Sequence, residues 1–475
     1  MDFKTPGAYV QEVTSLPASV AQVETAIPAF IGFTEKKAGS EEPVRITSML
    51  EYIENFGGSR SLDITVTKDG TENVLALAKQ EYKMYYAMQM FFNNGGGPCY
   101  IVSVGGYEDD FTQEAFEAGL TALLIEDEPT LIVMPELVNL NDDAKIYSVY
   151  KSALDQAEKL QDRFVIIDTT SDEGLRDNLS SGTSLKYGAA YYPNLITTLS
   201  YAYDEASVSV ETEVTTIVSE EVPAVPAEYD DDGNLVTPGT PAIPAVTETN
   251  IVTKTLAELN TEATSAEYNE VKAAVEAKLA TEQLILGPSS AIAGVYAKVD
   301  GTQGVWKSPA NVGLNYVSAP EVKLSNEDQE SYNVDANGKS INVIRSFTGK
   351  GNIVWGARTL DGNSGEWKYI SVRRFFNMVE ESVKNATEAF IFEPNTANTW
   401  VRVRGTIENF LNLQWRNGAL AGATPEDAFY VRVGLGQTMT SQDVLDGIMN
   451  IEIGMATVRP AEFIVLKFSH KLQEA

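Results

Sequence analysis

Residues 371–386 read SVRRFFNMVEESVKNA and form the most regular stretch of the chain. Their apolar side chains recur at intervals of three and four residues, at Val372, Phe375, Phe376, Val379 and Val383. This spacing places them on one face and predicts an amphipathic helix packed on a core. A second helix is predicted near 400–417, because its apolar residues are spaced in the same way and Gly418 follows as a stop.

Upstream of these two helices, short apolar strands alternate with helical stretches. Strands are predicted at 29–33, 100–104, 131–134 and 164–168, and helices at 74–92, 142–161 and 265–280. Strands that alternate with helices are typical of an α/β layer. We therefore expect a mixed α/β (α+β) fold with more than one domain.

Both ends of the chain have strand-like sequences. The first thirty residues predict an extended arm, since Thr5-Pro6-Gly7 breaks any helix and 8–13 alternates like a strand. Residues 462–468 predict a second strand just before the C-terminus. A terminal strand needs a sheet edge, which its own domain or a neighbouring subunit can supply. Residue spacing leaves both alternatives open.

The charge of the 475-residue chain is unevenly distributed. The net charge is −32, yet 339–475 carries +1, which leaves −33 on 1–338. A field of this sign repels phosphates, so we expect no nucleic-acid partner. The split suggests that the near-neutral region is buried against a partner; random scatter of surface charge is the alternative.

No Lys or Arg lies between Lys186 and Lys254. Within this interval, 207–214 alternates like a half-buried strand, five prolines interrupt the sequence further on, and 230–234 favours a tight turn. We expect an exposed excursion of strands and loops over roughly 204–252. Its removal is expected to lower solubility without preventing assembly.

The chain offers little material for catalysis or for a metal site. It has one histidine, His470, near the C-terminus, and one cysteine, Cys99, which fits a buried apolar residue better than a nucleophile. The glycines at 95–97 lie between a helix and a strand, the reverse of the order in a phosphate-binding loop. The acidic run 230–232 lacks the glutamate of a calcium loop, which leaves weak calcium binding as the less favoured alternative. We expect no catalytic residue, no cofactor and no metal.

Several separated stretches resemble the contractile tail sheath proteins, in the order of that family. They include TPGAYVQEV at 5–13, FFNNGGGPCYIV at 91–102 and VRPAEF at 458–463. Further matching stretches lie at 27–34, 189–193, 288–296, 304–311, 354–360, 367–374, 392–395 and 418–422. Together they span most of the chain except roughly 200–285.

This resemblance implies a structural subunit that polymerises as stacked hexameric rings around an inner tube and contracts to drive the tube through a target envelope. The expected partners are neighbouring sheath subunits, the inner tube protein, and baseplate and terminal cap proteins, without nucleic acid and without membrane insertion. The subunit would be made and assembled in the bacterial cytoplasm. It would belong to a phage tail, a tailocin or a released extracellular injection particle, which the sequence does not distinguish.

The resemblance also implies terminal arms that add strands to sheets of neighbouring subunits. The arm residues carried over are Tyr9, Val10, Val13, Phe463, Ile464, Val465 and Leu466. The expected organisation is an N-terminal arm (1–26), an α/β domain (27–200), an acidic outward insertion (201–255), a return to the core (256–338), a C-terminal core domain facing the tube (339–460) and a C-terminal strand arm (461–475).

Arginines on the two C-terminal helices are candidates for charge contacts with the tube. They are Arg373, Arg374, Arg402, Arg404 and Arg416. The alternative is pairing within the subunit to acids such as Glu380, Glu381 or Glu408.

Two other classes of protein compete with a sheath. A non-contractile, self-assembling acidic surface or adhesion protein would also exchange terminal strands, but the first residues show no apolar run of a secretion signal. An α/β enzyme is disfavoured by the single histidine and the reversed order around the glycine-rich loop.

Overall fold

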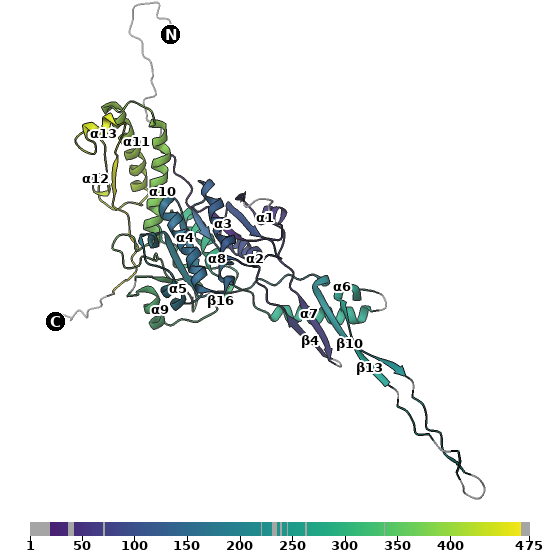
Figure 1. Cartoon of the computed structure of the whole chain (residues 1–475). Coiled ribbons are helices and arrows are strands. Elements are labelled where there is room, and N and C mark those ends of the chain that lie inside the picture. The colour runs from purple at the N-terminus through teal and green to yellow at the C-terminus, as the bar shows by residue number, and fades with distance from the viewer. Residues whose placement is uncertain are drawn as a thin grey trace, which may run out of the picture. The chain divides into compact units, whose positions relative to one another are not determined.

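The computed structural model describes residues 20–36, 42–69, 72–219, 221–229, 235–237, 240–244, 246–261, 264–336 and 338–466. The chain forms two compact units (Figure 1). Unit 1 comprises Met1–Gly57, Met84–Ile196 and Ile285–Ala475, and unit 2 comprises Gly58–Lys83 and Thr197–Leu284. Each unit is therefore assembled from segments that are distant in sequence.

Unit 1 is built on a nine-stranded sheet in the order β15-β18-β17-β8-β7-β6-β1-β5-β2. Its strands are β1 (Pro28–Phe33), β2 (Val44–Ile46), β5 (Cys99–Gly105), β6 (Leu131–Val133), β7 (Phe164–Asp168), β8 (Gly188–Tyr192), β15 (Val312–Gly313), β17 (Ile341–Phe347) and β18 (Gly351–Val354). The run from β17 to β5 is parallel, and the outer strands β2, β18 and β15 pair antiparallel. The four predicted core strands are confirmed as β1, β5, β6 and β7. Their continuous burial is typical of strands covered on both faces.

Several helices of unit 1 lie beside this sheet. They are α1 (Met49–Phe56), α2 (Met84–Asn93), α3 (Gln113–Ala122), α4 (Asp143–Leu160), α5 (Asp172–Asn178), α8 (Ser289–Gln303) and α9 (Asn326–Asn333). The predicted helix at 142–161 is confirmed as α4, which begins where the Asp142 carboxylate accepts hydrogen bonds from the backbone N–H groups of Ala144 and Lys145. A small sheet of β14 (Ile285–Leu286), β9 (Leu195–Thr197) and β16 (Val317–Pro320) completes this part.

The helix predicted at 74–92 is wrong in its first half. Residues Glu72–Leu77 form strand β4, and helix α2 begins only at Met84. Strand β4 pairs antiparallel with β3 (Ile64–Asp69), and Leu75 and Leu77 pack on the core of unit 2. The alternation of apolar residues at 74–77 is therefore that of a strand. The helical spacing of apolar residues begins only with α2.

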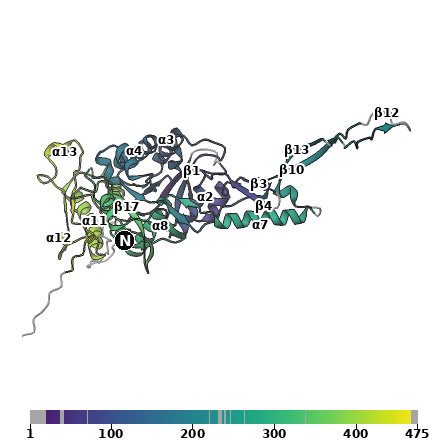
Figure 2. The same ribbon diagram turned by 90° about the horizontal axis from the view of Figure 1, so that it is seen from below.

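Unit 2 is a four-stranded sheet in the order β13-β10-β3-β4, with α6 (Leu256–Leu259) and α7 (Ser265–Thr281) beside it (Figure 2). The predicted helix at 265–280 is confirmed as α7. Its buried residues Val271, Val275 and Leu279 join β-strand residues such as Ile64 and Val208 in one core. The expected division near 255 is therefore not a boundary between compact units, because both helices pack on the strands that precede it.

The predicted excursion is one long β-hairpin. Strands β10 (Val208–Ser219) and β13 (Val246–Thr255) pair antiparallel along their whole length. Isolated bridges Val222↔Ile243 and Val225↔Thr240 continue the ladder to β11 (Glu228–Tyr229) and β12 (Leu235–Thr237). Prolines flank these bridges at 223, 226, 241 and 244. Residues 230–234, including the acidic run, lie outside the described residues.

The C-terminal part of unit 1 contains the two helices predicted from the opening stretch. They are α10 (Ile370–Thr387) and α11 (Ala397–Arg416), drawn in green in Figure 1. Short elements follow: α12 (Pro425–Ala428), β19 (Phe429–Arg432), α13 (Ser441–Leu445) and β20 (Glu452–Met455). Phe375, Val379, Ile407 and Phe410 form their shared core, which also buries Val20 from the N-terminal segment.

Candidate assembly site

The described residues give no sign of metal chemistry or thiol chemistry. Among them, no group of three or more His, Cys, Asp or Glu side chains could hold a metal ion. Cys99 is fully buried in β5, and this burial raises the pKa of its thiol, as expected for a core residue rather than a nucleophile. No helix in the described part of the chain has the length and apolar character needed to span a membrane.

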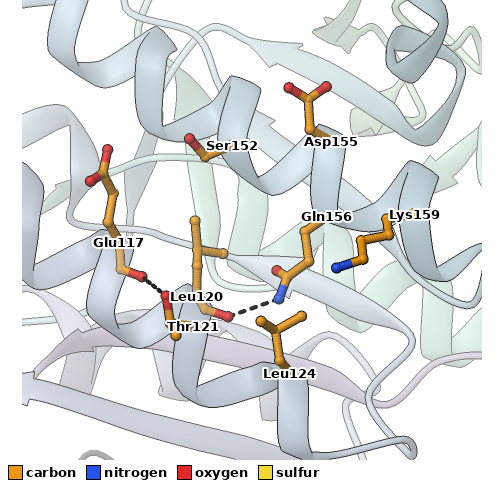
Figure 3. Close-up of a pocket in the computed structure, with 8 residues that line it drawn as sticks. All are labelled: Glu117, Leu120, Thr121, Leu124, Ser152, Asp155, Gln156 and Lys159. Carbon is orange, nitrogen blue, oxygen red and sulfur yellow. Dashed lines mark hydrogen bonds between the residues drawn. The ribbon is translucent and has the colours of Figure 1, made fainter.

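A surface groove of about 450 Å³ lies between α3 and α4 (Figure 3). The Gln156 amide donates to the carbonyl oxygen of Leu120, and the Thr121 hydroxyl donates to the carbonyl oxygen of Glu117. Both drawn hydrogen bonds thus end on the helix backbone rather than joining a nucleophile to a base. Leu124 is exposed at the border of the groove.

The C-terminal root, which we define as Glu462, is bound tightly to unit 1. Its carboxylate accepts hydrogen bonds from Arg358 Nε (2.9 Å) and Nη2 (2.8 Å), from Asn333 Nδ2 (2.9 Å) and from the Tyr369 hydroxyl (3.2 Å). Burial alone would raise the pKa of the Glu462 carboxyl, but the hydrogen bonds from Arg358 and Asn333 outweigh it and hold that pKa below its usual value. Glu462 is therefore a fixed point directly before residues 463–466.

Four apolar residues follow this fixed point and are exposed. The exposed fractions are 73% for Phe463, 79% for Ile464, 78% for Val465 and 71% for Leu466. The described part of the predicted strand 462–468 pairs with none of the strands that the structure describes. A contiguous apolar segment left in water favours a partner that covers it.

The N-terminal root, defined as residues 20–27, is held between α8, α10 and α11. The backbone N–H of Val23 donates to Ser382 Oγ (3.1 Å), and the Thr25 hydroxyl donates to Asp300 Oδ2 (2.6 Å). Arg374 Nη2 donates to the carbonyl oxygen of Thr25 (2.8 Å). The predicted arm residues Tyr9, Val10 and Val13, which precede this root, lie outside the described residues.

Strands β19 and β20 form a sheet of only two strands. Within the described residues, the outer edge of each strand therefore has no strand beside it. One face packs on the core through Val431 and Ile453, while Tyr430 and Arg432 lie on the exposed side. An unpaired edge of this kind is a template for an added strand.

The five candidate tube-contact arginines fall into two groups. Arg373 and Arg374 are 2% and 3% exposed and pair with Glu380 and Asp300 within the chain. The structure thus places these two in the alternative considered above, intrasubunit pairing, and neither guanidinium is available at the surface.

The other three arginines are at least partly exposed on α11, Arg402 and Arg416 on one flank of the helix and Arg404 on the opposite flank. Arg402 pairs with Glu393, and Arg404 lies 3.8 Å from Glu408. Arg416 is exposed in the last turn of α11. Exposed ion pairs contribute only about 0–1 kcal/mol, so a partner can displace them readily.

The residues that fix the two roots could not be identified from sequence. Arg358 and Glu462 both lie in stretches that carry the family resemblance, but nothing in their spacing pairs them across 104 residues. Asp300 and Ser382 lie in ordinary helical sequence, and only their three-dimensional positions bring them to the N-terminal root.

Comparisons with known proteins give a consistent result. A family profile described as the phage tail sheath C-terminal domain matches residues 363–471. The tail sheath protein of Enterobacteria phage T4 is 26% identical over 180 residues, which make up 37% of this chain and 26% of that protein. The match thus spans about a quarter of that curated relative.

Two solved structures are similar over nearly the whole chain. One is the sheath complex of an extracellular contractile injection system, PVC, in the contracted state, with 27% identity, 99% of both chains covered and a TM-score of 0.64. The other is the helical sheath of the anti-feeding prophage in the contracted state, with 30% identity, 99% of this chain and 100% of that chain covered, and a TM-score of 0.63.

Proposed function

The chain belongs to the contractile tail sheath family, and from this membership we propose that it is a structural subunit that polymerises around an inner tube and contracts. Membership in this structural family makes the chain a sheath subunit rather than an enzyme. The particle is a phage tail or an extracellular contractile injection system. We propose that its subunits form stacked hexameric rings. The partners we propose for these rings are an inner tube, a baseplate and a terminal cap.

The observation that carries the proposal is the C-terminal root followed by an exposed apolar segment. Glu462 is fixed by four hydrogen bonds, and Phe463–Leu466 continue from it uncovered. Full burial of an apolar side chain of this size contributes roughly 1.5–3 kcal/mol. Covering this segment in an assembly is therefore a substantial driving force for polymerisation.

We further propose that β19 and β20 of a neighbouring subunit receive the terminal arms as additional strands. Their free edges support strand addition, and each backbone hydrogen bond gained contributes about 0.5–1.5 kcal/mol net. Such links would keep subunits connected while their relative positions change during contraction.

For the tube contact we retain Arg402, Arg404 and Arg416. Their exposure on α11 and the near-neutral charge of 339–475 support contacts between this helix and the tube, while the acidic hairpin would turn outward. Solvent-exposed ion pairs are weak and salt-sensitive, so a sheath that is held on its tube by such pairs can slide along the tube.

Electron microscopy of the purified full chain, alone and with its tube protein, tests the proposal. A variant that ends at Glu462 keeps the C-terminal root but removes the apolar segment. We expect wild type to form hollow polymers in a long and a shortened form, and the truncated chain to remain a folded single subunit. A control variant, Leu124→Ser with Ile125→Ser, removes exposed apolar groups elsewhere and should still polymerise.

Two outcomes would contradict the proposal. Polymers that persist without residues 463–475 would remove strand addition by the C-terminal arm. Polymers of one fixed length that ignore the tube protein would favour the non-contractile, self-assembling alternative.

A further inference from the structure

Helix α10 contacts the roots of both arms. At its N-cap, the Tyr369 hydroxyl donates to Glu462 Oε2 (3.2 Å), in the C-terminal root. Five residues later, Arg374 Nη2 donates to the carbonyl oxygen of Thr25 (2.8 Å), in the N-terminal root. Further along the helix, Ser382 Oγ accepts from the backbone N–H of Val23 (3.1 Å).

We propose that α10 is a mechanical coupler between the two arms, and that Arg374 and Asp300 form the latch that fastens the N-terminal root to it. This inference rests on the proposed sheath function, because the arms carry load only in an assembly. It assigns positioning roles to residues whose side chains are buried within the chain.

The latch is built around a buried arginine. Both terminal nitrogens of Arg374 donate to the Asp300 carboxylate, Nη1 to Oδ1 at 3.1 Å and Nη2 to Oδ2 at 2.5 Å. The guanidinium also stacks on the ring of Tyr296, with its Cζ 4.5 Å from the ring centroid. Tyr296 and Asp300 lie one turn apart on α8, so one face of α8 presents both groups to Arg374.

Thr25 is bound at two of its atoms by this pair. Its hydroxyl donates to Asp300 Oδ2 and its carbonyl oxygen accepts from Arg374 Nη2. The root cannot leave α10 without giving up bonds to both members of a charged pair. Hydrogen bonds to charged groups are stronger than neutral ones, which suits a point that must carry load.

Hydrogen bonds, together with one apolar contact, hold the middle of the root. Gln22 and Glu24 are exposed, and the segment lines a cavity of about 420 Å³ next to α8. Between Val20 and Ile27, the partly buried Val23 packs against the core of α10 and α11. A buried ion pair is also not needed for stability as such, since apolar substitutes are often as stable. The role of the Arg374–Asp300 pair is instead to hold the backbone of Thr25 in place.

The path between the two roots is short and stiff. Arg374 and Tyr369 are separated by about 7.5 Å along the helix axis, at about 1.5 Å per residue. Most of the first three turns of α10 are buried in unit 1, which keeps the helix from bending under load. Tension on one arm can therefore reach the other through α10.

Proteolysis of the unassembled chain tests the latch independently of any sheath. A glutamate-specific protease cuts after the exposed Glu24 only when the root opens, and intact-mass analysis identifies the product that begins at Thr25. Arg374→Met removes the latch directly. Thr25→Val with Ser382→Ala removes only root hydrogen bonds and leaves the ion pair, so it remains informative if Arg374→Met fails to fold.

We expect Thr25→Val with Ser382→Ala to be cut about fivefold faster than wild type, as for the loss of two hydrogen bonds that close a local opening. Arg374→Met should be cut faster still, because it removes three hydrogen bonds and leaves the Asp300 carboxylate without its ion-pair partner. Thr302→Val is the matched control, because its hydroxyl bonds only to its own helix α8. Cutting of Thr25→Val with Ser382→Ala at the wild-type rate would overturn the latch, whether or not the chain forms sheaths.

Coupling is tested in assembled sheaths by counting broken sheaths after contraction. Arg374→Met and Tyr369→Phe each interrupt one end of the same path, so the double variant should break no more often than the worse single variant. Additive breakage would overturn the coupler. Failure of wild type to form sheaths would instead reject the proposed function and leave the proteolysis result standing.

Discussion

Arg358 and Glu462 are joined by two parallel hydrogen bonds, Nε to Oε1 at 2.9 Å and Nη2 to Oε2 at 2.8 Å, across 104 residues of sequence. The remaining terminal nitrogen of Arg358, Nη1, donates to the carbonyl oxygen of Asn333, and its backbone N–H donates to Asn342 Oδ1. Arg358 is 5% exposed. Arg358 therefore holds the C-terminal root in place, and a substitution of Glu462 alone should weaken this attachment.

Glu462→Gln should lower the free energy of unfolding by about 1–2 kcal/mol, because a neutral amide accepts weaker hydrogen bonds from Arg358. Thermal and urea unfolding of the single chain measure the change. Glu452→Gln on β20 is the control, since that exposed carboxylate contacts only exposed groups and should shift stability by no more than about 0.5 kcal/mol. Equal effects at both positions would contradict a special role for Glu462.

The contribution of Glu462 should depend on pH in a defined direction. Its pKa is lowered in the folded chain from the ordinary 4.5, so the stabilisation is fully present above about pH 4.5 and is lost as the pH falls through the folded value. Unfolding curves of wild type and Glu462→Gln should differ by a constant amount from pH 5 to 7 and converge in more acidic solution. A difference that grows toward acid would have the wrong sign.

Asp168 should produce the opposite dependence. Asp168 is the last residue of β7 and is fully buried beside the start of α8. This burial raises the pKa of its carboxyl to about 7, although Ser289 donates hydrogen bonds to both carboxylate oxygens. The folded chain binds this proton more tightly than the unfolded chain, so wild-type stability should fall as the pH rises from about 4 to 7. Asp168→Asn should flatten that slope in pH-dependent unfolding, whereas Asp155→Asn at an exposed site should keep it.

Charge reversal on α11 tests the tube contact. Arg402→Glu, Arg404→Glu and Arg416→Glu should each weaken recruitment of the tube protein several-fold at low salt and have less effect at high salt, because exposed charges are screened. Co-sedimentation with the tube measures this. Arg459→Glu is the control, as that side chain bonds to the carbonyl oxygen of Gly365. Unchanged recruitment in all three variants would rule out tube contacts through the arginines of α11.

The two ways of shortening the acidic hairpin should have different consequences. Removal of 204–252 deletes β10, whose Val208 and Val210 are buried between β3 and the helices of unit 2. We therefore expect that deletion to unfold unit 2, which replaces the simpler expectation of lower solubility alone. Removal of 221–244, closed by a short turn, should keep unit 2 folded and assembly intact, as measured by circular dichroism and electron microscopy.

Periodicity predicted the elements whose packing is local. Helices α4, α7, α10 and α11 and strands β1, β5, β6 and β7 follow directly from apolar spacing, because each buries one stripe or both faces. Local spacing does not predict strand β4, because its pairing with β3 and its packing on the core of unit 2 decide its conformation. The latch and the C-terminal root join residues far apart in sequence, and only the tertiary structure brings them together.

Tyr9, Val10 and Val13 lie outside the described residues, so their role as arm residues stays a prediction. Phe463, Ile464, Val465 and Leu466 are exposed as strand addition requires, yet a single chain has no neighbour with which to pair. Their partners belong to the assembly, and neither the sequence nor one subunit contains that information.

The prolines beside the bridges of the distal hairpin matter when many copies stand side by side. Proline has no N–H to offer a neighbouring ribbon, so crowded hairpins are protected against zipping into a cross-β stack. Strands β19 and β20 contain no proline, so their edges can still form backbone hydrogen bonds with an added strand. Hairpins of neighbouring subunits can therefore lie close together without pairing edge to edge, whereas the edges of β19 and β20 permit an added strand.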